Sequence, residues 1–176
     1  MRTYKIASIP GDGIGAEVIS SGITVLEALA EKALDIEFLI DNFNWGSEYY
    51  KSQGSMMPDD GLEQIRSHDA ILFGSAGHPD IPDHITLWGL RLAICQPFDQ
   101  YANVRPARLL PGIRSPLSSG GEKIDWVIVR ENSEGEYAGI GGRVHQGQPI
   151  EVATDVSMLT RVGVKRIMKF AFSLAQ

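Results

Sequence analysis

The chain has 176 residues, a formal net charge of -6 and a single cysteine. The acidic balance argues against nucleic acid as a partner, and one cysteine excludes an internal disulfide. The N-terminal apolar run is too short for a signal peptide and no segment is long enough to cross a membrane, so we expect a globular cytoplasmic protein with no membrane partner.

Strand-like and helix-like patterns alternate along the chain, which predicts an α/β fold. In chain order we expect a strand at 4–9, a helix at 14–33, a strand at 36–40, a helix from about 58 to 68, a strand at 70–73, a helix at 87–93, an extended segment at 101–110, and strands at 124–130 and 150–156. The first helix carries an expected apolar stripe of Val18, Val25, Leu26 and Leu29. We expect a turn at 139–142 and a crossing between domains at 111–121, because both segments are rich in turn-forming residues.

The last segment, 157–176, predicts a helix that Ser157 could cap. No glycine, asparagine or proline ends it, and the sequence FAFSLAQ is still in helical register at Gln176. We therefore expect that the chain is part of a longer protein, with a natural terminus as the alternative.

A glycine-rich motif, PGDGIG, lies between the first strand and the first helix, and Asp41 follows the second strand. That context invites a dinucleotide-binding interpretation, but the third glycine follows the second by two residues instead of three. The favoured interpretation is a structural turn with Asp12 near the helix start. Anion binding by the free N–H groups of the helix remains the alternative.

Three arginines and a tyrosine are the candidate site residues. Arg130 comes directly after an apolar strand, Arg91 lies in LWGLRLAI, and Arg105 lies in ANVRP, where Pro106 imposes an extended backbone. The guanidinium of an arginine can make two parallel hydrogen bonds to a carboxylate or a phosphate. Binding of one shared anion would therefore explain the three arginines. Singly, each arginine would be interpreted as solvated or structurally paired, and Tyr137 as an ordinary half-buried tyrosine.

Other polar groups are assigned no site. The residues His78, His84 and Cys95 show no metal-ligand spacing, so we expect no metal site in this chain. A solvated loop face is expected for Glu131, Glu134 and Glu136.

As an ordered set, these motifs resemble the β-decarboxylating dehydrogenases of 2-hydroxy acids, which include isopropylmalate, isocitrate, tartrate and D-malate dehydrogenases. The segment IPGDGIGAEV matches the opening of the family, and FGSAGHP matches its glycine-rich turn before the nicotinamide region. The family's substrate arginines are matched by LR, NVRP and VIVREN, and its catalytic tyrosine by Tyr137. The resemblance begins at Lys5 and is strongest to the tartrate/D-malate branch, through PDHITLWGLRLAICQPFDQYANVRP. It implies an isopropylmalate dehydrogenase-like two-domain α/β fold, which is not a true Rossmann fold and is incomplete in this chain. Residues 1–100 would be the N-terminal part of the first domain, and 101–176 the first part of the second, which serves substrate binding and dimerisation.

The resemblance also implies roles. The carboxylates of a small hydroxy-dicarboxylate would be bound by Arg91, Arg105 and Arg130. The nicotinamide ring of NAD would lie near Ile85, Thr86 and Leu87. Tyr137 would act as general acid in decarboxylation. The family's catalytic lysine and its ligands for Mn2+ or Mg2+ come later than Gln176, so we expect the chain alone to be inactive and the full-length protein to be a homodimer or a larger assembly.

Two departures from the family pattern restrict the expected size of the substrate. Arg91 and Arg105 are fourteen residues apart, farther than in the isopropylmalate and isocitrate enzymes, so residues 93–100 should contain an extension. Trp88 could fill the space that an isopropyl group needs. Both departures favour a small substrate, D-malate or tartrate, over isopropylmalate.

Two further functions stay open. The chain could be a catalytically dead anion-binding or regulatory subunit of the same family. It could also be a dinucleotide-binding module, which the glycine spacing disfavours.

Overall fold

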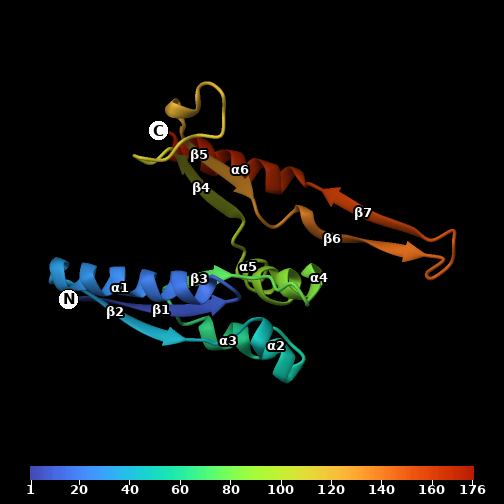
Figure 1. Cartoon of the computed structure of the whole chain (residues 1–176), viewed down its shortest axis with the longest axis horizontal. Coiled ribbons are helices and arrows are strands. Elements are labelled where there is room, and N and C mark those ends of the chain that lie inside the picture. Colours follow the sequence, from blue (N-terminus) through green and yellow to red (C-terminus); the bar gives the residue numbers. More distant parts are fainter. The chain divides into compact units, whose positions relative to one another are not determined.

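The computed structural model describes residues 1–176 apart from the side chain of Glu122. The chain divides into two compact units, Met1–Ile94 and Cys95–Gln176, and each is described by itself. Figure 1 labels the elements of both units.

The first unit is built on a three-stranded parallel sheet in the order β2-β1-β3. Ile6 in the central strand pairs with Ile40 on one side and with Ala70 on the other. Parallel strands need crossover connections, and the first crossover is the long helix α1, which packs along the sheet (Figure 1). The elements are β1 (Arg2–Gly11), α1 (Gly15–Ala33), β2 (Ile36–Asn42) and β3 (Ala70–Ser75).

The face that α1 turns to the sheet differs from the predicted stripe. Ile19 is the buried apolar side chain of this helix, whereas Val18, Val25 and Leu29 are exposed. Leu26, the fourth residue of the predicted stripe, is partly buried. The predicted stripe was therefore wrong at three of its four positions, although the helix itself was predicted within a residue of its bounds.

Short helices complete the first unit. One was not predicted, and the segment expected as a helix from 58 to 68 is helical over only five residues. The helix expected at 87–93 is a composite, because a π-helical turn replaces its centre. The elements are α2 (Ser47–Gln53), α3 (Gly61–Ile65), α4 (Asp83–Thr86), η1 (Leu87–Leu92) and α5 (Ala93–Cys95), which ends at the start of the second unit.

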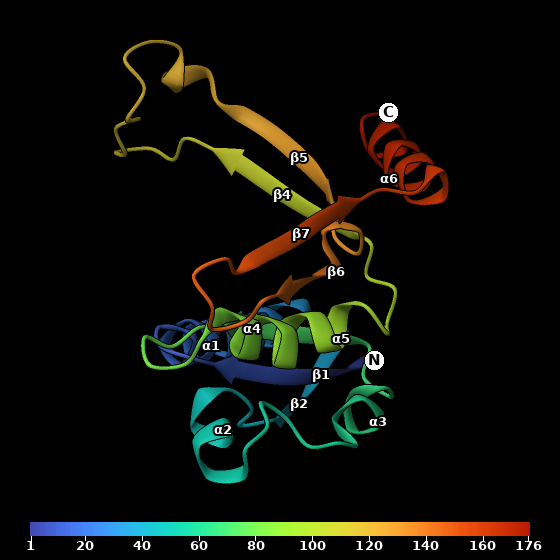
Figure 2. The ribbon, with the colours of Figure 1, turned by 90° about the vertical axis from the view of Figure 1, so that its right-hand side faces the viewer.

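The second unit contains two antiparallel strand pairs and a helix (Figure 2). In the first pair, Asn103 lies opposite Arg130. The segment 111–121 connects the two strands of this pair within one unit, so its prediction as a crossing between domains was wrong. The elements are β4 (Ala102–Arg108), η2 (Gly121–Lys123), β5 (Asp125–Glu131), β6 (Gly135–Val144), β7 (Val152–Met158) and α6 (Arg161–Leu174).

The expected turn at 139–142 is also wrong, because these residues belong to strand β6. A Cβ on Gly141 would overlap the carbonyl oxygen of Thr154 in β7, so the glycine is required by the close approach of the two backbones. The reversal falls instead after Val144, where His145 and Gly147 take positive φ angles of 55° and 73°.

Helix α6 begins later than predicted. Ser157 lies in β7 and caps nothing, whereas Thr160 is the N-cap and its hydroxyl accepts a hydrogen bond from the N–H of Gly163 at 3.0 Å. The helix contacts β5, where Val127 and Val129 lie near Leu174.

Burial differs sharply between the units. Among the described side chains, every buried hydrophobic one belongs to the first unit, including Ile9, Leu90 and Leu92. In the second unit even large apolar side chains are exposed, such as Trp126 at 59% and Phe172 at 69%. None of the helices in the part of the chain that the structure describes combines the length and apolar character that crossing a bilayer requires.

Candidate functional site

The glycine-rich motif forms a brace around Asp12. One carboxylate oxygen of Asp12 accepts a hydrogen bond from the N–H of Ser47 at 2.6 Å, and the other accepts one from the N–H of Gly77 at 2.8 Å. The N–H of Asp12 donates to the carbonyl oxygen of Ser75 at 2.8 Å. Asp12 directly follows β1, Ser47 comes after β2, and Ser75 and Gly77 end or follow β3. Asp12 therefore joins the segments at the carboxyl ends of all three strands.

Two glycines, Gly11 of the motif and Gly46 after β2, make room for this brace. Gly11 has a φ of +68°, and a Cβ there would overlap the carbonyl oxygen of Ser75. Gly46 has a φ of +137°, and its Cβ would lie 2.8 Å from the Asp12 carboxylate. The space is therefore filled by the protein's own backbone and by the buried Asp12 side chain. This agrees with the structural interpretation of the motif, a turn with Asp12 near the start of α1.

Arg130 and Tyr137 are brought together in the second unit. The guanidinium carbon of Arg130 lies over the Tyr137 ring, 5.3 Å from its centroid. Nη2 of Arg130 donates to Oδ1 of Asn132 at 3.3 Å, while its Nε is buried with no hydrogen-bond partner among the described residues. Asn132 also donates to the carbonyl oxygen of Gln100 at 3.0 Å, which fixes the end of β5.

Arg105 shares a face with Arg130. In the antiparallel register Arg105 pairs with Ile128, and Asn103 pairs with Arg130. Residues that lie opposite each other in two paired strands project from the same face, and so do residues two positions apart in one strand. Ile128 and Arg130 are two positions apart, so Arg105 and Arg130 are diagonal neighbours on one face of the β4–β5 pair. Arg105 is exposed and Arg130 is partly buried.

The remaining predicted site residues lie in the first unit. Arg91 is on the π-helical turn η1, between the fully buried Leu90 and Leu92. The buried neighbours fix the backbone that carries Arg91, and π-helical turns are frequent at functional sites.

The residues assigned to the nicotinamide differ in access. Ile85 and Leu87 are partly exposed, whereas Thr86 is 1% exposed and belongs to the core of this unit. Partly exposed apolar side chains fit the face of an aromatic ring, and the buried Thr86 does not offer such a contact.

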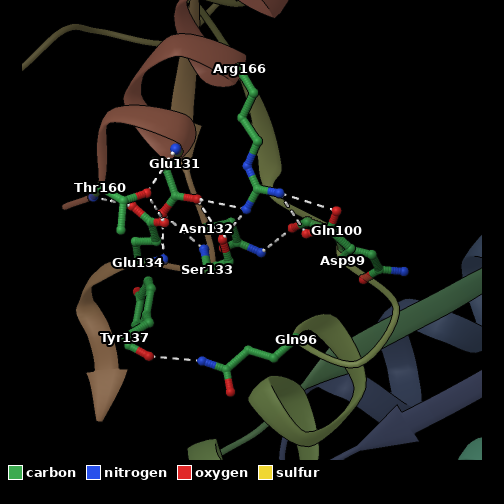
Figure 3. Close-up of polar contacts among 11 residues, drawn as sticks. Gln96, Asp99, Gln100, Glu131, Asn132, Ser133, Glu134, Tyr137, Thr160 and Arg166 are labelled. Carbon is green, nitrogen blue, oxygen red and sulfur yellow. Dashed lines mark hydrogen bonds and ion pairs between the residues drawn. The ribbon is translucent and has the colours of Figure 1, made fainter. Parts of the chain in front are cut away.

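Glu131 and Glu134 are not the solvated loop face that the sequence suggested. The Glu131 carboxylate accepts hydrogen bonds from the hydroxyl of Ser133 at 2.6 Å and from the N–H groups of Ser133 and Glu134 at 2.9 and 2.6 Å (Figure 3). Burial alone would raise the pKa of Glu131, but these hydrogen bonds and the charge of Arg166 hold it below its ordinary value. Glu134 in turn accepts hydrogen bonds from the N–H and hydroxyl of Thr160 at 2.7 and 2.6 Å.

Arg166 of α6 is the other structural centre that sequence reasoning missed. Its Nη1 binds both carboxylate oxygens of Asp99 at 2.8 and 3.1 Å, and its Nη2 donates to the Ser133 hydroxyl at 2.7 Å (Figure 3). Its guanidinium carbon also lies 4.5 Å from the centroid of the Tyr101 ring. Nothing in the local sequence signals these partners, because they are distant in the chain.

A divalent metal does not fit the described residues. They contain no group of three or more His, Cys, Asp or Glu side chains that could hold an ion. Asp12 and Glu131 have their oxygens committed to backbone N–H groups, so neither is free to act as a ligand.

Comparison with known proteins extends these observations. The isocitrate/isopropylmalate dehydrogenase family matches residues 5–176. A probable tartrate dehydrogenase/decarboxylase of Agrobacterium vitis is 64% identical over 177 residues, covering 100% of this chain and 49% of that protein. The decarboxylating D-malate dehydrogenase of Escherichia coli (strain K12) is 52% identical over 182 residues, again covering 100% and 49%. This chain thus spans about half the length of these curated relatives.

The fold comparison agrees. The crystal structure of isocitrate dehydrogenase from Methylococcus capsulatus superposes with a TM-score of 0.80 at 31% identity, covering 98% of this chain and 47% of that one. The likeness confirms the expected isopropylmalate dehydrogenase-like α/β fold over about half the length of that structure. The chain belongs to the isocitrate/isopropylmalate dehydrogenase family.

Proposed function

We propose that this chain supplies the first half of an enzyme that oxidises a small 2-hydroxy acid, D-malate or tartrate, with NAD and decarboxylates the product. The relatives named for tartrate and D-malate chemistry support this substrate class, since they match the whole chain. The single observation that carries the proposal is the placement of Arg130 over the Tyr137 ring with Arg105 on the same face of its strand pair.

The arginines would bind the substrate carboxylates. Arg130 retains a buried Nε–H without a partner among the described residues, and a carboxylate would satisfy it. Arg105 would bind the same substrate from its diagonal position, and Arg91 would contribute from the π-helical turn. Fixing both carboxylates orients the C2–H bond and the carboxylate that is lost.

Tyr137 would be the proton donor. Its ring lies against the Arg130 guanidinium, which would hold the phenol beside the bound carboxylate. After carbon dioxide leaves, the phenol O–H would donate its proton to the carbon that carried it. Ile85 and Leu87 would hold the nicotinamide of NAD, which when bound accepts the hydride. A divalent metal, Mn2+ or Mg2+, would be bound by residues outside this chain, because the described residues offer no site for one.

We further propose that the domain boundary of the full-length protein falls at 100/101, with 101–176 serving substrate binding and dimerisation, and that the protein is a homodimer or larger. The exposed apolar side chains of the second unit support contacts beyond this chain. Light scattering of the full-length protein tests this, and a monomer at micromolar concentration would contradict it.

The function itself is tested with a substrate panel on the full-length protein that contains this sequence. We expect NADH formation and carbon dioxide release from D-malate or tartrate, and no turnover of isopropylmalate, because Trp88 takes the space of the isopropyl group. Turnover of isopropylmalate would contradict the substrate assignment. Binding of hydroxy acids without any turnover would instead favour the regulatory alternative.

A further inference from the structure

The segment between Arg91 and Arg105 contacts the backbone of Tyr137. Nε2 of Gln96 donates a hydrogen bond to the carbonyl oxygen of Tyr137 at 2.8 Å, across 41 positions of sequence (Figure 3). The contact is partly buried, and both residues belong to the second unit. Gln96 falls within the extension that lengthens the spacing between the two arginines.

The β6–β7 ladder is irregular around Tyr137. The β6–β7 ladder pairs Gly135 with Met158 and resumes only at Ile140 with Val156, with a register shift between them. Tyr137 lies inside this irregular stretch, where its N–H donates a hydrogen bond to the carbonyl oxygen of Glu134 at 3.3 Å. The Gln96 side chain therefore adds a hydrogen bond to the backbone at a point where the ladder is irregular.

Gln96 is itself held firmly. The segment that follows it closes with a hydrogen bond from the N–H of Gln100 to the carbonyl oxygen of Cys95 at 2.9 Å. Asp99, with a φ of 48°, is gripped through both carboxylate oxygens by Arg166. The carbonyl oxygen of Gln100 accepts from Asn132 at 3.0 Å, and Asn132 also binds Arg130.

We propose that Gln96 is a positioning residue that holds Tyr137 in place for proton transfer, and that the extension in residues 93–100 exists to supply it. The inference rests on the proposed function, in which Tyr137 is the proton donor. The hydrogen bond fixes the backbone of Tyr137 and so keeps its ring over the Arg130 guanidinium. An error of about 1 Å in the placement of a catalytic group can reduce a rate by up to about a hundredfold.

The test compares three variants of Gln96 in the full-length protein. Gln96→Glu and Gln96→Met keep the length of the side chain but lose the N–H donor, whereas Gln96→Lys keeps a donor. We expect kcat for decarboxylation to fall about tenfold in the first two, with KM changed less than about twofold because the arginines remain. Gln96→Lys should recover most of the rate. The matched control is Gln53→Glu, which makes the same chemical change at the exposed end of α2 and should leave kcat unchanged.

A second measurement separates this inference from the proposed function. Amide hydrogen exchange and the NMR signal of the Tyr137 ring report on the contact even if the protein turns over no hydroxy acid. Faster exchange at 135–140 with unchanged protection of α6 is expected for Gln96→Met. Unchanged exchange there, unchanged kcat in Gln96→Glu and Gln96→Met, or equal loss in Gln96→Lys and Gln96→Met would overturn the positioning role.

Discussion

Replacing two helical glycines by alanine should have opposite effects on local stability. In Gly22→Ala, the new Cβ on α1 meets only a Leu72 methyl at 3.8 Å, which is ordinary contact. Alanine is favoured over glycine inside a helix, so α1 should gain about 0.5–1 kcal/mol. In Gly163→Ala, the new Cβ would overlap the Glu134 carboxylate.

The magnitude for Gly163→Ala follows from the contacts of Glu134. To make room, this carboxylate must leave Thr160, to which it is bound by two hydrogen bonds of 2.7 and 2.6 Å at the start of α6. The site is exposed, so we take about 1 kcal/mol for each bond, or about 2 kcal/mol in all. Subtracting the helix preference of alanine leaves a net destabilisation of about 1–1.5 kcal/mol.

Hydrogen exchange read by mass spectrometry resolves the two helices separately, which global unfolding of a chain with two units does not. The free energy of local opening should rise for peptides of α1 in Gly22→Ala and fall for peptides of α6 in Gly163→Ala. Equal stabilisation of both helices would refute the account of Glu134 as a partner of the Thr160 cap.

Three further outcomes are expected. Tyr137→Phe in the full-length protein should reduce decarboxylation about a hundredfold or more and oxidation much less, as seen from carbon dioxide release against NADH formation; equal loss would remove its role as proton donor. The pKa of Glu131 is held below its ordinary value, so its contribution to stability is complete above about pH 4.3 and is lost as the pH falls through the lowered pKa. Glu131→Gln should therefore reduce the loss of unfolding free energy at acidic pH, measured by urea unfolding at several pH values, and an unchanged loss would contradict this. Asp12→Ala should destabilise the first unit by about 2 kcal/mol or more, since it leaves the buried N–H of Ser47 and the partly buried N–H of Gly77 without an acceptor; a loss below about 1 kcal/mol in urea unfolding would show that the brace is dispensable.

The order of strands and helices could be predicted from the sequence because apolar periodicity and turn residues are local signals. The errors came where a distant partner decides the structure. Ser157 and Thr160 both offer a capping hydroxyl, and the choice of Thr160 is stabilised by Glu134, which lies 26 positions away. The π-helical turn of η1 has no local signature in the sequence, since its apolar pattern fits an ordinary helix equally well.

The same reasoning applies to the candidate site. The motifs predicted Arg105, Arg130 and Tyr137 as site residues. The register of β4 and β5 explains why Arg105 and Arg130 lie near each other on the second unit. The role of Arg166 could not be predicted, because Asp99 and Ser133 come from separate segments of the folded chain. Glu131 binds the neighbouring Ser133 and Glu134, a local arrangement that the sequence analysis missed. Gln96 had no signal at all beyond its position in the extension.

The position of the strand pairings along the chain has a consequence for synthesis. Every pairing of the β2-β1-β3 sheet lies within residues 1–94, so this sheet can form as soon as this part of the chain has left the ribosome. The strands and helix made afterwards carry large apolar side chains that are open to water. Exposed apolar surface of this kind is where chaperones bind during folding.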